Sequence, residues 1–183
     1  VRSFQHEVGK GGSLRSNSVY SLLVDRDGLI WVGFYQLGLD YTLYQSELFH
    51  TYSYPPYFDT KDMPVRTITF RGSEKLIGSR DGLYFIDEQR GRYAGFSAPQ
   101  LRSSMIICSY AFQGKYYIGT YGGGMYVLDP VTLTISDFEP HVVQPFVKGQ
   151  IFCIKSDMEG CLWIGTSVGL FRYKDGRMLN HYT

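Results

Sequence analysis

The chain has 183 residues, 44% of them hydrophobic and 19% charged, so it is long enough to bury a core and is neither disordered nor highly charged. Its net charge of +1, without a basic stripe, excludes an electrostatic surface for nucleic acid or anionic lipid. No apolar run reaches the ~18 residues of a membrane-spanning helix, so we expect no membrane insertion in this segment. The chain starts at Val1 without a leader and looks like a piece of a longer protein, whose export signal would lie outside it.

Glycine and tyrosine dominate the composition. The 21 glycines indicate turns and the 16 tyrosines favour half-buried pleated surfaces, so together they predict many short strands. The three cysteines, Cys108, Cys153 and Cys161, are an odd number without a C-x-x-C pair, so we expect neither a metal site nor a disulfide framework.

One pattern recurs four times along the chain, and it is anchored on Gly33, Gly78, Gly119 and Gly165, which are 45, 41 and 46 residues apart. Each unit opens with two apolar residues three apart: Val19 and Leu22, Val65 and Ile68, Met105 and Cys108, Ile151 and Ile154. A polar turn follows ("DRDG", "RGSE", "FQGK", "DMEG"), as expected of a hairpin. A bulky residue then stands two before the anchor glycine: Trp31, Leu76, Tyr117 or Trp163.

The second half of each unit predicts two further strands. A second glycine with an apolar partner follows the anchor: Gly38-Leu39, Gly82-Leu83, Gly124-Met125 and Gly169-Leu170. A third strand begins there, and "SELFHTYSY", "GRYAGFSA", "LTISDFEP" and "RMLNHYT" are compatible with a more irregular fourth. Four short strands per unit of ~40–45 residues are typical of a β-propeller blade.

We therefore predict an all-β chain of about four four-stranded blades, a fragment of a seven-bladed propeller. The predicted blades span residues 13–58, 59–99, 100–145 and 146–183, and residues 1–12 are interpreted as the outer strand of a preceding blade. In such a fragment the outer sides of the first and last blades would expose apolar surface, so we expect isolated fragments to pair. The loops after the second and fourth strands of each blade would share one face.

The first and last units resemble the two-component-regulator propeller repeat, whose pattern runs S-L-x-x-N-x-V, then D-x-x-G-x-L-W-I-G-T-x-x-G-L. In the first unit the match is carried by Ser13, Leu14, Asn17, Val19, Leu22, Asp25, Gly28, Trp31, Gly33, Gly38 and Leu39. In the last unit it is carried by Ile151, Ile154, Asp157, Gly160, residues 162–166, Gly169, Leu170 and Tyr173. The middle units depart from the pattern, since their Asp–Gly turn is altered and Leu76 and Tyr117 replace tryptophan.

The resemblance implies the periplasmic sensor region of a Bacteroides-type hybrid two-component protein anchored in the inner membrane. Such regions comprise two seven-bladed propellers and a small β-sandwich, followed by a membrane helix and a histidine kinase. They bind polysaccharide-derived oligosaccharides and signal as homodimers. This chain would then be a noncatalytic sensing segment that controls a transcriptional response, with the kinase outside it.

Several glycine-rich and acidic segments resemble chemical motifs, but each is explained better as a turn. "GTSVG" lacks the following helix and the G-K-[ST] of a phosphate loop, and "DRDG" lacks the further oxygen ligands of a calcium loop. "SDMEGCLW" misses the spacing of the sialidase Asp-box, and a resemblance to quinone-cofactor propellers is confined to the third unit. We therefore predict no metal and no cofactor.

No catalytic residues are predicted, because His6, His50, His141 and His181 are scattered and form no Ser–His–Asp or Cys–His frame. The cysteines are interpreted as small apolar residues, with Cys108 in the frame of Leu22, Ile68 and Ile154. Trp31 and Trp163 are expected to pack between blades.

The candidate ligand-binding residues lie in the loops after the second strands, where side chains vary between units: Tyr35, Gln36, Arg80, Asp81, Tyr121 and Ser167. Longer connections add Tyr54, Tyr57, Phe58 and His141. Aromatic rings beside hydrogen-bonding groups suit a sugar. A propeller lyase or glycosidase and a protein-interaction scaffold are the alternatives.

Overall fold

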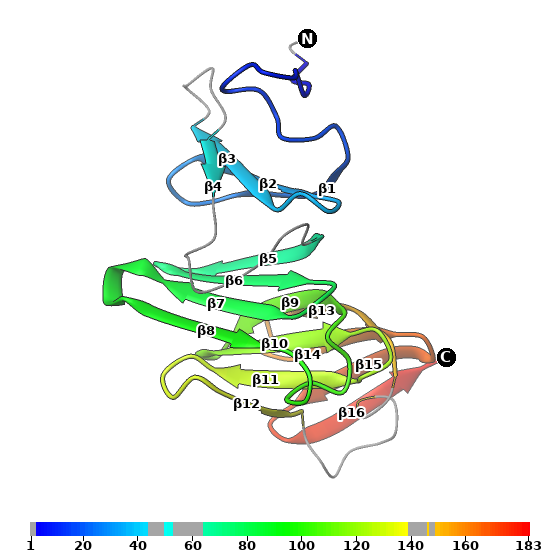
Figure 1. The fold of residues 1–183 in the computed structure, drawn as a ribbon. Helices are drawn as coiled ribbons and strands as arrows, with labels where there is room; N and C mark the ends of the chain where they lie inside the picture. The colour runs from blue at the N-terminus through cyan, green and yellow to red at the C-terminus, as the bar shows by residue number, and fades with distance from the viewer. Residues whose placement is uncertain (1–2, 44–49, 53–63, 139–145, 147–148) are drawn as a thin grey trace. The chain divides into compact units, whose positions relative to one another are not determined.

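The computed structural model describes residues 3–43, 50–52, 64–138, 146 and 149–183. Within them the chain forms four four-stranded antiparallel sheets, each a simple meander in chain order (Figure 1). The first two sheets comprise β1 (Val19–Val24), β2 (Leu29–Phe34), β3 (Leu39–Leu43) and β4 (His50–Tyr52), then β5 (Val65–Arg71), β6 (Glu74–Ser79), β7 (Leu83–Asp87) and β8 (Arg92–Phe96). The last two comprise β9 (Ile106–Phe112), β10 (Lys115–Thr120), β11 (Met125–Asp129) and β12 (Thr134–Asp137), then β13 (Ile151–Ser156), β14 (Leu162–Thr166), β15 (Gly169–Lys174) and β16 (Arg177–Tyr182).

The predicted all-β propeller fold is confirmed, since each repeat forms one four-stranded antiparallel sheet. The exact bounds of the blades stay a prediction. Residues 3–12 contain turns and no strand. Their role as the outer strand of a preceding blade stays a prediction, because such a strand would pair with residues outside this chain. None of the helices formed by the described residues has the length and apolar character needed to cross a membrane.

The chain divides into two compact units, Val1–Ile68 and Thr69–Thr183. In the second unit, neighbouring sheets bury apolar side chains between them. Between the second and third sheets these include Leu76, Phe85, Ile106, Tyr116 and Ile118. Between the third and fourth sheets they include Met125, Phe138, Ile151, Leu162 and Phe171. At about 25 cal/mol per Å² of apolar area removed from water, these layers dominate the stability of the unit.

The anchor glycines are required because neighbouring side chains approach their Cα atoms closely, and not because their backbone conformation excludes other residues. Gly119 pairs with Cys108 across the sheet, and a Cβ added at Gly119 would lie 2.6 Å from the Cys108 sulfur and 2.8 Å from Cβ of Ile151. The second glycine of the repeat has a conformational reason. Gly169 has φ +127°, and a Cβ there would lie 2.2 Å from the Tyr182 carbonyl oxygen.

The register corrects one detail of the predicted repeat. Cys108 pairs with Gly119, as Ser21 pairs with Gly33, so Cys108 does not share the frame of Leu22. The apolar opening residue of the third sheet is Ile106, and Ser109 takes the place of Leu22. The pairing of Met105 with Cys108 was wrong because residues 105–108 are all apolar, so spacing alone fits two frames.

The Asp and Trp of the repeat are bonded to each other in the first sheet. Asp25 Oδ1 accepts hydrogen bonds from the amides of Asp27 (3.0 Å) and Leu29 (2.9 Å), which close the β1–β2 turn. Its Oδ2 accepts the indole N–H of Trp31 at 2.8 Å. We call this arrangement the Asp–Trp clamp. The buried Trp31 ring also stacks on Tyr41 of the same sheet.

The fourth sheet repeats the clamp. Asp157 Oδ1 accepts the amides of Glu159 (3.0 Å) and Cys161 (2.8 Å), and its Oδ2 accepts the indole N–H of Trp163 at 2.8 Å. The indole bond, followed by the amide bonds, lowers the pKa of Asp157 below its usual value. The "D-x-x-G" turn is therefore a hydrogen-bonding motif with the carboxylate fully engaged. The clamp gives the two tryptophans a role within their own sheets in addition to the predicted packing.

Apolar side chains remain exposed in the first and last sheets. On β1, Leu22 and Val24 are 66% and 65% exposed. On the fourth sheet, Phe152 and Leu179 are each 47% exposed. The predicted pairing of fragments through such surfaces stays a prediction.

Candidate functional site

One edge of each sheet carries the loop between its second and third strands, and we call it the loop edge. The opposite edge carries the hairpins that join the first strand to the second and the third to the fourth, and we call it the turn edge. All six residues predicted as ligand-binding lie on loop edges and are exposed: Tyr35, Gln36, Arg80, Asp81, Tyr121 and Ser167.

The residue two positions after the anchor glycine is held by the same backbone bond in three sheets. The amides of Tyr35, Tyr121 and Ser167 donate to the carbonyl oxygen of the residue just before the first strand of their own sheet. The distances are 3.0, 2.9 and 3.1 Å, to Ser18, Met105 and Gln150 respectively. The main chain thus fixes the position of this residue whatever its side chain is.

In the first unit the loop edge carries an aromatic pair. The rings of Tyr20 and Tyr35 stack with centroids 5.0 Å apart and an interplanar angle of 23°. Both side chains are exposed, at 55% and 38%. Gln36 follows with φ +75°, a left-handed conformation, and its side chain is exposed. This edge therefore carries two exposed rings and an exposed glutamine, and their role in ligand binding stays a prediction.

An arginine that precedes β1 secures this loop. The Arg15 guanidinium donates to the Leu37 carbonyl oxygen at 3.0 Å, and the Arg15 amide donates to Asp40 Oδ2 at 2.9 Å. Asp40 is fully buried, and its Oδ1 lies 3.4 Å from Arg15 Nε. Arg15 therefore positions the loop that carries Tyr35.

The third sheet uses the same device. The Arg102 guanidinium donates to the Gly123 carbonyl oxygen at 3.1 Å and to Asp137 Oδ1 at 2.6 Å, and the Arg102 amide donates to Tyr126 Oη at 2.6 Å. Sequence reasoning missed Arg15 and Arg102. Their signal was the tripeptide Leu-Arg-Ser at 14–16 and 101–103, four residues before the first strand in the corrected register.

In the second sheet the loop edge presents opposite charges. The Ser79 hydroxyl oxygen accepts the amides of Asp81 and Gly82, each at 3.0 Å, which orders the turn and leaves the side chains of Arg80 and Asp81 in solvent. Burial, reinforced by the Asp81 carboxylate, raises the pKa of the nearby Tyr84. Within the described part of the chain, no hydrogen bond or ion pair engages the Arg80 guanidinium or the Asp81 carboxylate.

The predicted residues occupy equivalent loops without bonding to one another. Arg80, Asp81, Tyr121 and Ser167 come from three sheets of the second unit, and Tyr35 and Gln36 come from the first unit. Among the described residues, no hydrogen bond or ion pair joins these side chains. The further candidates Tyr54, Tyr57, Phe58 and His141 lie outside the described residues.

One cluster has the residue types of a metal site. Ligand-type atoms of Asp157, Glu159 and Cys161 lie within 4.8 Å of one another. However, the Arg172 guanidinium forms ion pairs with both carboxylates, and Asp157 holds the clamp. The Asp157 carboxylate is therefore already used by the clamp, and both carboxylates share the Arg172 guanidinium.

The fold and the repeated loops place the chain in a structural class, the β-propellers built from four-stranded blades. The family model described as "Two component regulator propeller" then matches residues 13–36 and 145–168. These are the first and last units, in which the Asp–Trp clamp is found. The first and last units are therefore similar to the two-component regulator propeller repeat.

Solved structures agree on the fold. The extracellular domain ascribed to the hybrid two component system BT3049 from B. thetaiotaomicron is similar over 96% of this chain, with 24% identity and a TM-score of 0.76. The extracellular domain ascribed to the one component system BT4673 from the same organism is similar over 97%, with 20% identity and a TM-score of 0.73. PorZ, a surface component of the type-IX secretion system of Porphyromonas gingivalis, is similar over 100%, with 13% identity and a TM-score of 0.74.

This chain spans only part of those proteins. It covers 25%, 24% and 29% of their respective lengths. No curated protein sequence matches the chain. PorZ shares the fold within a secretion system, so the fold alone does not define a ligand.

Proposed function

We propose that this chain is a noncatalytic sensing segment of a two-component regulator that binds an oligosaccharide along its loop edges. The observation that carries the proposal is the repeated backbone bond that fixes Tyr35, Tyr121 and Ser167 while their side chains differ. An invariant main-chain position with a variable exposed side chain serves recognition better than packing. The two-component regulator repeats supply the signalling context.

The chemistry of the loop edges supports a sugar ligand. Tyr121 is 49% exposed and Tyr35 is 38% exposed, so each presents a ring to solvent. Arg80, Asp81 and Gln36 add hydrogen-bonding groups. Rings that contact an apolar face, beside charged and amide groups that bind hydroxyls, suit a pyranose.

The parent protein would act as a periplasmic sensor of the inner membrane. We propose that it works as a homodimer whose histidine kinase lies outside this chain, in line with the extracellular domains that share the fold. A bound ligand can bias the kinase only if it binds two conformations of the sensor with different affinity.

Calorimetric titration of the full-length ectodomain with polysaccharide-derived oligosaccharides tests the proposal. We expect saturable binding that weakens about fivefold in Tyr121→Ala, from the loss of about 1 kcal/mol of aromatic contact. Met158→Ala, a fully exposed residue on the turn edge, is the matched control and should bind as the parent does. Absence of glycan binding would favour an interaction scaffold, and release of shortened glycans would favour a lyase or glycosidase.

A further inference from the structure

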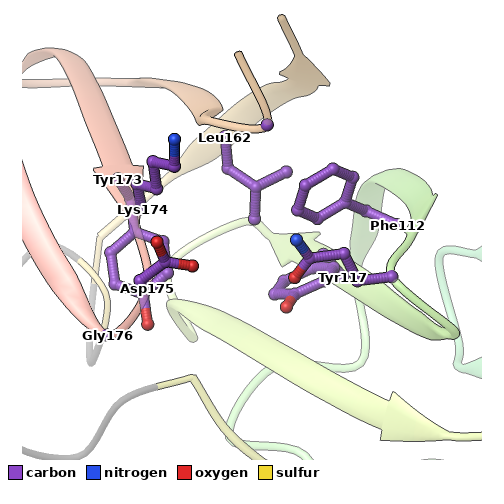
Figure 2. A pocket seen from close by; sticks show the side chains of 9 residues that line it. Phe112, Tyr117, Leu162, Tyr173, Lys174, Asp175 and Gly176 are labelled. Carbon is purple, nitrogen blue, oxygen red and sulfur yellow. The ribbon is translucent and has the colours of Figure 1, made fainter. Parts of the chain in front are cut away.

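A cleft of about 100 Å³ lies between the third and fourth sheets at their turn edges. Figure 2 shows Phe112 and Tyr117 along one side of it, Tyr173 and Asp175 along the other, and Leu162 between them. None of the residues predicted to bind ligand lines it, since all of those lie on loop edges. The cleft is therefore a separate feature from the proposed sugar site.

The cleft follows from the turns that border it. The β9–β10 turn is Gln113–Gly114, with φ +46° and +77°, and the β15–β16 turn is Asp175–Gly176, with φ +47° and +78°. Such two-residue turns are the shortest hairpin connections, so they reach only a short way along the edge. The third sheet has Tyr117 at the position where the fourth sheet has the clamped Trp163. The β9–β10 turn therefore has no indole ring beside it.

The walls and the rim of the cleft differ in chemistry. Leu162 and Tyr173 are buried, and the partly buried Phe112 and Tyr117 continue an aromatic cluster, with ring centroids 6.2 Å apart. At the rim the Asp175 carboxylate is exposed, and within the described part of the chain no hydrogen bond or ion pair engages it. The Lys174 ammonium also belongs to the lining, but it donates to the Glu159 carbonyl oxygen at 2.8 Å.

We propose that this cleft binds the side chain of a lysine from a protein partner. Ring walls attract the alkyl stem and the adjoining cation, and the unengaged Asp175 carboxylate complements the ammonium group. The volume selects this occupant, because pockets for whole small molecules measure roughly 300–1,000 Å³. A cleft of about 100 Å³ holds one side chain and leaves the rest of the partner on the turn edge.

The experiment titrates the full-length chain with two matched probes, Nα-acetyl-lysine methylamide and Nα-acetyl-norleucine methylamide. Binding is measured from the NMR chemical shifts of the backbone amides. We expect saturable shifts at Phe112, Tyr117 and Asp175 with the lysine probe, and binding about threefold weaker with the uncharged probe. Asp175→Asn should reduce the affinity for the lysine probe to that same level. Asparagine also adopts the left-handed conformation found at this position, so the turn is retained.

Two further variants complete the test. Asp27→Asn makes the same charge change on an exposed turn of the first sheet and should leave the affinity unchanged. Lys174→Met removes the like charge from the lining and should tighten binding of the lysine probe only. Equal affinity for the two probes, an unchanged affinity in Asp175→Asn, or the absence of saturable shifts would each overturn the proposal.

Discussion

The third and fourth sheets form the same meander but close their first hairpin by different means. The fourth sheet uses the Asp–Trp clamp, in which Asp157 bonds two turn amides and the Trp163 indole. The third sheet uses Gln113–Gly114, whose two left-handed residues close the turn through the backbone. A side-chain clamp and a tight backbone turn are therefore two ways to close the same hairpin. The tight turn leaves space beside it, and the cleft lies there.

The largest expected effect is a difference in stability between alanine variants of the anchor glycines in these two sheets. Gly119→Ala should lower the free energy of unfolding by about 3 kcal/mol, since the added Cβ meets Ile151 as well as the Cys108 sulfur. Among the described residues, the only atom that a Cβ at Gly165 would meet within 3 Å is the sulfur of the exposed Cys153, which can move away. Urea unfolding of the two variants measures the difference. Equal losses would contradict the close approach of the third and fourth sheets at Gly119.

A smaller loss is expected when the clamp is broken. Asp25→Ala should lower the free energy of unfolding by about 2 kcal/mol, because it leaves the indole N–H of the buried Trp31 without its partner. The control in the unclamped sheet is Gln113→Asn, which suits the left-handed turn position and should leave stability unchanged or slightly raised. Thermal unfolding of both variants checks the pair. A stable Asp25→Ala would mean that the turn closes without the carboxylate.

The smallest perturbation is chemical and leaves the fold intact. Cys108 and Cys153 occupy the same register position in the third and fourth sheets. Burial raises the pKa of the Cys108 thiol to about 12, so at pH 8 about one in ten thousand of these groups is a thiolate. Cys153 is exposed. Iodoacetamide should therefore modify Cys153 first, as measured by peptide mass spectrometry, whereas in urea both cysteines should react alike. Equal rates in the folded chain would refute the difference in burial.

The sequence predicted the four sheets because anchor glycines, turn residues and bulky positions recur together, and each has a separate physical reason. It misassigned the opening of the third sheet, since residues 105–108 are apolar in both possible frames. The loop-edge positions could be predicted because they follow from Gly33 and its equivalents by counting. The repeated Leu-Arg-Ser tripeptide marks the positions of Arg15 and Arg102, but it could not show what they bond, because the loop acceptors of both guanidinium groups are main-chain carbonyl oxygens.

The cleft could not be predicted from the sequence either. Phe112 and Asp175 come from different sheets, and their separation depends on how closely two blades pack. The 44% of residues that are hydrophobic predict that blades pack, but a gap of this size arises from the lengths of particular turns.

The hydrogen bonds donated by the backbone amides of Tyr35, Tyr121 and Ser167 have a consequence for divergence among related propellers. Because the backbone anchors this position, a substitution of tyrosine by serine can replace a phenol by a hydroxyl group and leave the strands unchanged. The specificity of such a segment can then drift freely while its scaffold stays under selection. Relatives with nearly identical blades could then present different side chains at this position of the loop edge.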